Sequence, residues 1–159
     1  MSATPYQLDP TLDLGIERLV DLTPEQLWAA WTTPALLVQW FCPAPWTVSA
    51  ATLDLRPGGG FTTVMRSPEG QEHPHTGTFL EIVPNRRLVW TDALLPGYRP
   101  GPTPFITAVI TFEPRGNNTQ YTAVALHRDA AAREQHEQMG FIKGWNTALD
   151  QLIALMKRG

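Results

Sequence analysis

The C-terminal part of the chain carries the pattern that most constrains its fold. Proline does not occur after Pro114, and apolar side chains then recur at spacings of three and four residues. This spacing places them on one face of an α-helix. The positions that carry it are Met139, Ile142, Trp145, Leu149, Leu152 and Met156. With Asp129 as the N-cap and Lys157 near the negative end of the helix dipole, the pattern predicts one long amphipathic helix over residues 129–157.

Two glycines fall in the interior of this predicted helix. Gly140 and Gly144 would each destabilise a helix by about 1 kcal/mol relative to alanine. One interpretation is close packing, in which another backbone approaches the helix at these positions. The other is that the glycines leave space for a molecule bound between the helix and its partner. The sequence leaves both interpretations open.

Length, charge and cysteine content exclude several classes of protein. The chain has 159 residues, a net charge of −3 and no basic run, so nucleic-acid binding is not expected. Neither a membrane-spanning apolar stretch nor a signal peptide is recognisable, so no membrane span is expected. The single cysteine, Cys42, excludes an intrachain disulfide and fits a reducing compartment. We therefore expect a single cytoplasmic domain, residues 1–159, with its core at about 12–156.

The first part of the chain predicts a strand followed by two short helices. Residues 12–22 alternate in part between apolar and polar side chains, which is typical of a strand. The dipeptides Thr23-Pro24 and Thr33-Pro34 each predict the start of a helix. Threonine caps the first turn of a helix, and proline suits its first position because the missing N–H has no partner there anyway.

The middle of the chain predicts a series of strands separated by turns. They cover residues 46–55, 61–66, 76–83, 87–93, 105–113 and 119–127. The apolar parity of the first of these strands changes near Ala50, which predicts a bulge. Residues 94–104 are rich in proline and glycine and predict a loop. The order of elements predicts an α+β fold, with a curved antiparallel sheet wrapped around the C-terminal helix.

Several short motifs occur in an order that is typical of a known superfamily. They are Pro24-x-x-x-Trp28-x-x-Trp31, Thr33-Pro34-x-x-Leu37-x-x-Trp40-Phe41, Asp54-Leu55-Arg56-Pro57-Gly58-Gly59-Gly60-Phe61, Ser67-Pro68-Glu69-Gly70, Gly77-x-x-x-Glu81-Ile82-x-Pro84-x-Arg86-Arg87-Leu88-Val89-Trp90 and Gly144-Trp145-x-x-x-Leu149-x-x-Leu152. With these motifs the chain resembles the SRPBCC, or START-like, superfamily. More narrowly it resembles the AHSA-type family, named for the activator of the heat-shock-protein-90 ATPase.

The resemblance implies both a fold and a kind of site. The fold is the helix-grip (START-like/Bet v-like) fold, with two short helices after the first strand and a curved antiparallel sheet around a long C-terminal α-helix. The implied site is a cavity between sheet and helix that accepts a small apolar ligand. The glycine-rich turn at residues 58–60 joins two predicted strands. Because no helix follows it, we do not interpret it as a phosphate-binding loop.

Aromatic side chains and three polar side chains are the candidates for such a cavity. Small-molecule pockets are mostly apolar with a few placed polar groups, although aromatic residues are also ordinary core material. The aromatic candidates are Trp40, Trp46, Trp90, Tyr98, Phe105, Phe141 and Trp145, and the polar candidates are Asp92, Thr107 and His127. Asp92 and His127 lie near strand ends, where they could orient a polar ligand group or act as an acid/base pair. The alternative is that Asp92 satisfies loop backbone groups and that His127 caps the last helix or faces solvent.

The sequence supports a metal site or a catalytic nucleophile less well than it supports a ligand cavity. Residues 72–75 hold two histidines and a glutamate but lack a third ligand at metal-site spacing, so we interpret them as an exposed polar turn and expect no metal. Cys42 lies between a phenylalanine and a proline, which favours a packing role over a nucleophilic one. The sequence contains no Ser/His/Asp signature, CxxC pair or HExxH motif, so it predicts no named reaction and no cofactor.

Three functions agree with these features. The first is binding of a small hydrophobic or amphipathic molecule, favoured by the aromatic content, the helix glycines and a half-polar strand face at residues 105–111 that we expect to look inward. The second is an enzyme on the same fold, resembling the polyketide cyclases and aromatases, with Asp92, Tyr98, Thr107 and His127 as its polar groups. The third is a co-chaperone-like module that binds a protein. The sequence favours the first over an enzyme and leaves a homodimer open.

Overall fold

A curved antiparallel sheet forms the body of the protein. The computed structural model describes residues 8–158. Within them, seven strands pair in the order β1-β9-β8-β5-β4-β3-β2, and each neighbouring pair is antiparallel. The strands are β1 (Asp13–Val20), β2 (Thr47–Leu53), β3 (Gly60–Arg66), β4 (Glu72–Val83), β5 (Arg87–Thr91), β8 (Thr107–Arg115) and β9 (Asn118–Leu126). The register of β2 shifts between Val48 and Ala50, which confirms the predicted bulge.

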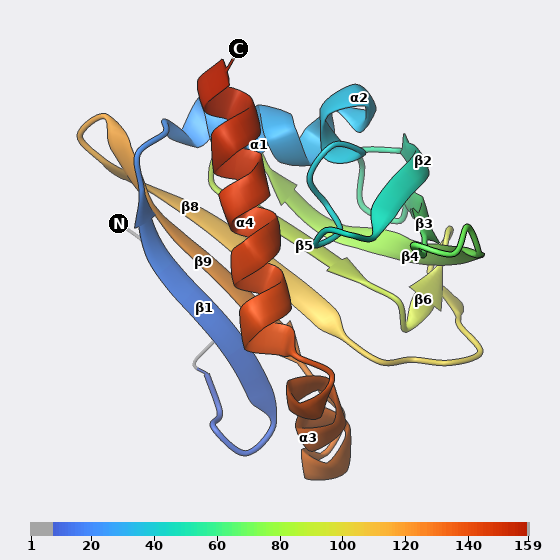
Figure 1. Cartoon of the computed structure of the whole chain (residues 1–159). Helices are drawn as coiled ribbons and strands as arrows, with labels where there is room; N and C mark the ends of the chain where they lie inside the picture. The colour runs from blue at the N-terminus through green and yellow to red at the C-terminus, as the bar shows by residue number, and fades with distance from the viewer. Residues whose placement is uncertain (1–7, 159) are drawn as a thin grey trace.

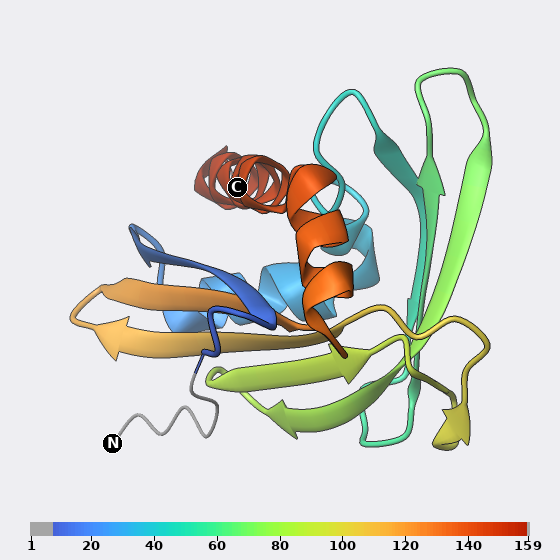
Figure 2. The same cartoon turned by 90° about the horizontal axis from the view of Figure 1, so that it is seen from below.

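Helices follow the first strand and end the chain. They are α1 (Pro24–Thr32), α2 (Pro34–Leu37), α3 (Ala130–Gln138) and α4 (Phe141–Arg158). Figure 1 shows α4 lying across the sheet, and Figure 2 shows the sheet curling around α4 and α3. This arrangement confirms the predicted α+β fold of the helix-grip type, with two short helices after the first strand.

Side-chain caps fix the starts of two helices where the sequence predicted them. The Thr23 hydroxyl accepts from the Gln26 backbone N–H at 3.2 Å, and the Gln26 side-chain oxygen accepts from the Thr23 N–H at 2.9 Å. This reciprocal capping box satisfies two backbone donors at the start of α1. The Asp129 carboxylate accepts from the Ala132 N–H at 2.8 Å and caps α3 in the same way.

The C-terminal helix is two helices, which corrects the prediction of a single one. α3 ends at Gln138, and Gly140 adopts a φ of +96° before α4 begins. Glycine reaches this left-handed region at little cost and commonly ends helices there. Met139 and Ile142, assigned to the apolar face, are 67% and 44% exposed and do not belong to the buried core. The spacing pattern missed the break because α3 itself carries few apolar residues.

Two other segments differ from the sequence interpretation. Residues 72–75 belong to β4 and not to a turn, since His73 and His75 pair with Met65 and Thr63 of β3. Residues 94–104, predicted as a loop, contain a two-stranded ribbon of β6 (Leu94–Leu95) and β7 (Arg99–Pro100). Both segments are polar or rich in proline and glycine, so their backbone pairing leaves little trace in hydrophobic periodicity.

The inner face of β8 is its fully apolar face. Ala108, Ile110 and Phe112 belong to the buried core, together with Leu149 and Leu152 of α4. The half-polar face, expected to look inward, therefore points away from α4. Alternation alone cannot tell the two faces of a strand apart when both carry apolar residues, because Val109 is also buried on the outer side.

One side of the sheet holds α4 in place. The helix packs closely against β1 and α1. Arg18 of β1 forms an ion pair with Asp150 at 2.8 Å, and Lys157 pairs with Asp21 at 2.7 Å. These pairs are partly exposed, so they orient the helix more than they stabilise it. Because α4 lies close to β1, the strands on the far side of the sheet face the helix across a wider space.

Alanine substitution at the two helix glycines tests the break between α3 and α4. Gly140→Ala should lower the free energy of unfolding by about 1–2 kcal/mol, because alanine at the positive φ of Gly140 is strained. The matched control is Gly144→Ala inside α4, where an added Cβ meets only Pro43 Cγ at 3.8 Å. Better helix propensity should there raise the free energy of unfolding by up to about 1 kcal/mol. Urea titration followed by circular dichroism measures both values, and a shift of the same sign in both variants would contradict the assigned break.

Candidate ligand-binding site

A large cavity lies between α4 and the far side of the sheet. Its volume is about 920 Å³, which is at the upper end of the range for small-molecule sites. The helix α4 forms one wall of the cavity, and strands β3, β4 and β5 form the opposite wall. The segments 40–43 and 102–106 close the remaining sides, and α3 lies at one end. Gly144 faces the cavity from α4, so the helix carries no side chain there. The second interpretation of Gly144, that it leaves space for a bound molecule, requires such a placement.

The walls of the cavity are mainly aromatic. Phe61 of β3 contacts Phe41 and Trp90 edge-to-face, with ring centroids 5.7 and 5.1 Å apart. On the helix side, Phe141 and Trp145 pack together at 4.9 Å. Such pairs fix one another's orientation, so the rings form walls and do not collapse into the space.

Gln151 of α4 holds one wall of the cavity in position. Its side-chain nitrogen donates to the carbonyl oxygens of Trp40 and Cys42 at 3.0 and 2.7 Å, and its oxygen accepts from the Ala44 N–H at 2.8 Å. These bonds satisfy the backbone of an irregular segment that would otherwise lack partners. The Phe41 ring next to this clamp is thereby directed into the cavity.

Several polar groups line the cavity, and some of them are already paired. The Asp92 carboxylate lines it but accepts from the backbone N–H groups of Phe105 and Ile106 at 2.7 and 3.0 Å. Trp31 Nε1 donates to the Tyr121 hydroxyl at 3.1 Å at another edge of the cavity. Trp90 Nε1 is buried and has no partner within residues 8–158. An unpaired buried donor costs about 1–3 kcal/mol, and Trp90 carries this penalty.

Two histidines meet at the α3 end of the cavity. His127 Nδ1 lies 2.8 Å from the Leu12 carbonyl oxygen, and His127 Nε2 lies 2.9 Å from His136 Nδ1. The His136 ring also contacts Phe105 and Phe141, with centroids 4.8 and 5.0 Å away. Burial and the neighbouring His127 lower the pKa of His136 to about 4, so His136 is neutral at pH 7.

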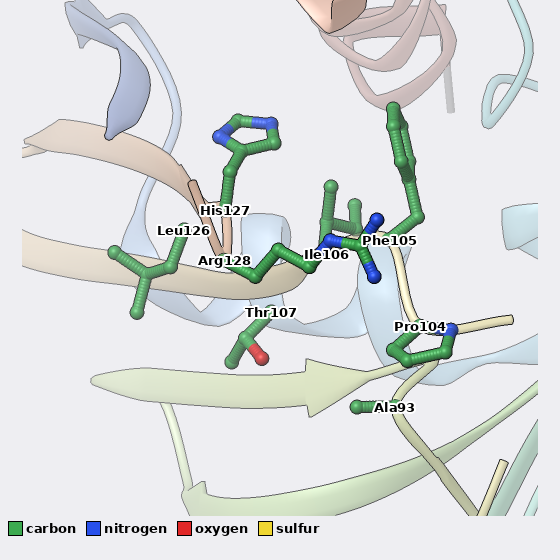
Figure 3. Close-up of a pocket in the computed structure, with 8 residues that line it drawn as sticks. All are labelled: Ala93, Pro104, Phe105, Ile106, Thr107, Leu126, His127 and Arg128. Carbon is green, nitrogen blue, oxygen red and sulfur yellow. The ribbon is translucent and has the colours of Figure 1, made fainter. Parts of the chain in front are cut away.

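A smaller depression adjoins the cavity beside these histidines. Its volume is about 210 Å³, and it shares Pro104, Phe105, Ile106 and Arg128 with the cavity. Figure 3 shows the Arg128 side chain extended from the end of β9 towards Phe105. Thr107 lies on the side of the depression nearer β5, where its hydroxyl is 2.9 Å from that of Thr91. The volume of the depression is below the usual range of about 300–1,000 Å³ for small-molecule sites.

The structure divides the predicted site residues into three groups. Those that line the large cavity are Trp40, Trp90, Asp92, Phe105, Phe141 and Trp145. Thr107 and His127 line the adjoining depression. Trp46 and Tyr98 line neither, because Trp46 packs beside His73 and Tyr98 packs on the Gly58 turn, 53% exposed. The Asp92 carboxylate accepts from loop backbone N–H groups, which is the second of the two roles considered for it from the sequence.

Several cavity residues had no place among the sequence candidates. They include Trp31, Phe41, Phe61, Tyr121 and His136. The motifs contained Trp31, Phe41 and Phe61, so the resemblance offered a signal for these three. The sequence did not indicate that His136 would be buried, because a histidine on the polar side of a predicted helix is ordinarily solvated.

Neither the thiol nor the titratable groups form a further reactive centre. Burial raises the pKa of Cys42 to about 11, so the thiol is protonated and weakly nucleophilic at pH 7. No three His, Cys, Asp or Glu side chains gather to hold a metal ion anywhere in residues 8–158. The site is therefore a mainly apolar chamber with isolated polar groups at its edges.

A curved sheet that grips a helix across a cavity is the architecture of a START-like, helix-grip domain. The family model of Activator of Hsp90 ATPase homolog 1-like proteins matches residues 21–157. Because the match spans most of the chain, this chain belongs to that family. A comparison with curated proteins gave no match.

Solved structures show the same fold along almost the whole chain. A crystal structure of a protein from Nitrosomonas europaea is 44% identical, covers 95% of this chain and 97% of its own, and superposes with a TM-score of 0.92. A protein from Mycobacterium smegmatis is 26% identical over 91% of this chain and 90% of its own, with a TM-score of 0.73. A protein from Rhodobacter sphaeroides is 21% identical, and the match covers 96% of this chain and 97% of its own. It shares the fold with a TM-score of 0.82.

The buried histidine makes stability depend on pH. The pKa of His136 is about 4 in the folded protein, against about 6.5 for an exposed imidazole, so the unfolded chain takes up a proton over this range while the folded chain does not. The free energy of unfolding is therefore fully retained above pH 6.5 and falls as the pH drops towards 4. Between pH 7 and pH 5 the decrease should be about 1–2 kcal/mol.

Replacement of the histidine tests this assignment. In His136→Phe, urea unfolding at pH 7 and pH 5 should show a smaller difference than in the natural protein. The control is Gln138→Phe, which places the same side chain at an exposed, non-titrating position of α3 and should leave the difference unchanged. An equal pH difference in His136→Phe and the natural protein would show that His136 is not the buried neutral group.

Proposed function

We propose that this protein binds a small hydrophobic or amphipathic molecule in the cavity between α4 and strands β3–β5. The observation that carries the proposal is the cavity itself, about 920 Å³ in volume and lined mainly by aromatic side chains. Burial of a ligand's apolar surface against such walls contributes about 25 cal/mol per Å². A ligand of two or three fused rings fits a chamber of this size and surface.

The polar groups of the lining support an amphipathic ligand. Cys42, Tyr121 and His136 also line the cavity, so polar atoms interrupt its apolar surface. Arg128 and Gln135 lie at the edge of the same cavity, where they could meet a polar end of the ligand. A mostly apolar pocket with a few such groups is the usual form of a small-molecule site.

The polar groups expected for an enzyme do not converge on one point. Tyr98 is exposed outside the cavity, and Thr107 bonds to Thr91 in the adjoining depression. Asp92 uses one carboxylate oxygen for two backbone N–H groups. The arrangement therefore supports binding more strongly than catalysis. None of the helices in residues 8–158 has the length and apolar character to cross a membrane.

Filling the cavity from α4 tests the proposal. The probe is 1-aminoanthracene, a neutral fused-ring fluorophore, and its binding is followed by energy transfer from the tryptophans of the cavity. Gly144→Leu places a side chain into the cavity and should weaken binding by about tenfold or more, because about 1.4 kcal/mol of lost contact gives a factor of ten. Gly144→Ala is the matched control and should change the affinity little. Unchanged affinity in Gly144→Leu, or no saturable binding to the natural protein, would contradict the proposal.

A further inference from the structure

The histidine pair at the α3 end of the cavity has one ring nitrogen without a hydrogen-bond partner, and this nitrogen belongs to His136. His136 lines the cavity, and its Nδ1 is taken by His127. Within residues 8–158, the hydrogen bond of His136 is made by Nδ1, and Nε2 makes none. His127 uses both of its ring nitrogens, one for His136 and one for the Leu12 carbonyl oxygen. The pair therefore presents a single unused nitrogen.

The contacts of the pair fix which nitrogens carry protons. A carbonyl oxygen only accepts, so His127 Nδ1 carries the proton of the 2.8 Å contact to Leu12. A neutral imidazole carries one N–H, so a ring that donates from Nδ1 accepts at Nε2, and in this tautomer His136 Nδ1 donates across the 2.9 Å contact. A neutral His136 consequently holds its free lone pair on Nε2. The chain of bonds thus turns His136 Nε2 into an acceptor.

The surroundings of His136 make this acceptor selective. Phe105 and Phe141 pack against the ring, and His136 is only 9% exposed, so mainly apolar groups surround the imidazole. A hydrogen bond in such a setting is stronger than in water. Burial also keeps the ring neutral, since it lowers the pKa of His136 to about 4. Nε2 therefore stays an acceptor across the physiological pH range.

We propose that His136 Nε2 is the polar subsite of the cavity and accepts a hydrogen bond from the hydroxyl group of an otherwise apolar alcohol or phenol. His127 is the positioning residue, because it holds His136 in the required tautomer. This inference rests on the proposed function and names the chemical class of its ligand. It also gives the cavity a direction, with the hydroxyl end of the ligand at α3 and its apolar body between α4 and the sheet.

Other polar groups on a ligand fit Nε2 less well. A ketone or a carboxylate offers only lone pairs, which repel the lone pair of the imidazole. An ammonium group could donate, but its burial among aromatic rings costs several kcal/mol, and the cationic Arg128 lines the same cavity. A neutral hydroxyl supplies the donor without a charge.

The tautomer of His136 can be measured without any ligand. In the natural protein labelled with ¹⁵N-histidine, two-bond and three-bond ¹H–¹⁵N correlations at pH 7 report which nitrogen carries the proton. We expect His136 with the proton on Nδ1 and a free Nε2. In His127→Phe, which removes the acceptor for that proton, we expect a shift of His136 towards the Nε2-protonated form. A proton on Nε2 of His136 in the natural protein would overturn the inference.

Three matched ligands then test the hydroxyl preference. They are 2-naphthol, which can donate a hydrogen bond, 2-methoxynaphthalene, which can only accept one, and naphthalene, which does neither. Quenching of tryptophan fluorescence at pH 7 gives the three affinities. We expect 2-naphthol to bind about fivefold to tenfold more tightly than 2-methoxynaphthalene. In His136→Phe the advantage of 2-naphthol should disappear, while the affinity for naphthalene is retained.

The outcomes separate this inference from the proposed function. Binding of all three compounds with equal affinity would overturn the hydroxyl subsite and leave ligand binding in the cavity intact. A preference for 2-naphthol that persists in His136→Phe would assign the subsite to another residue and also overturn the inference. No binding of any compound would overturn both. Retained binding of naphthalene in His136→Phe shows in the same experiment that the variant is folded.

Discussion

The packing of α4 against one side of a wide, curved sheet is the constraint on which the rest of the structure depends. The helix lies close to β1 and α1, where Leu149 and Leu152 are buried almost completely. A single helix cannot also reach the strands on the far side, because the sheet curves away from it. Aromatic side chains line the resulting space, and their edge-to-face contacts keep it open. The cavity is thus a consequence of how one helix meets one sheet.

The same geometry decides which polar groups are free to act. Irregular segments at the rim of the cavity have backbone groups to satisfy, and Asp92 and Gln151 are used for that purpose. The histidine pair differs, because its chain of hydrogen bonds begins at a backbone carbonyl and ends on a nitrogen without a partner. Under the proposed function, such a nitrogen would influence which ligand is preferred.

Much of the fold was predictable because it depends on local patterns. The caps at Thr23 and Asp129, the bulge near Ala50 and the order of the elements all follow from a few neighbouring residues. Six of the ten site candidates line the large cavity, since aromatic residues near strand ends and on the helix face tend to turn inward. Trp46 and Tyr98 do not, because β2 lies at the edge of the sheet and Tyr98 sits in the ribbon between β6 and β7.

The sequence by itself determined the α+β class, the element order and the apolar stripe of α4, because helix periodicity, strand alternation and caps are properties of residues close in the chain. Tertiary structure alone decided which face of β8 looks inward and where the terminal helix breaks at Gly140. It also decided that His127 meets His136, since that contact depends on how α3 folds back over the end of β9. The size of the cavity was likewise decided by the tertiary structure. It is set by the distance between α4 and strands that are remote from α4 in the sequence.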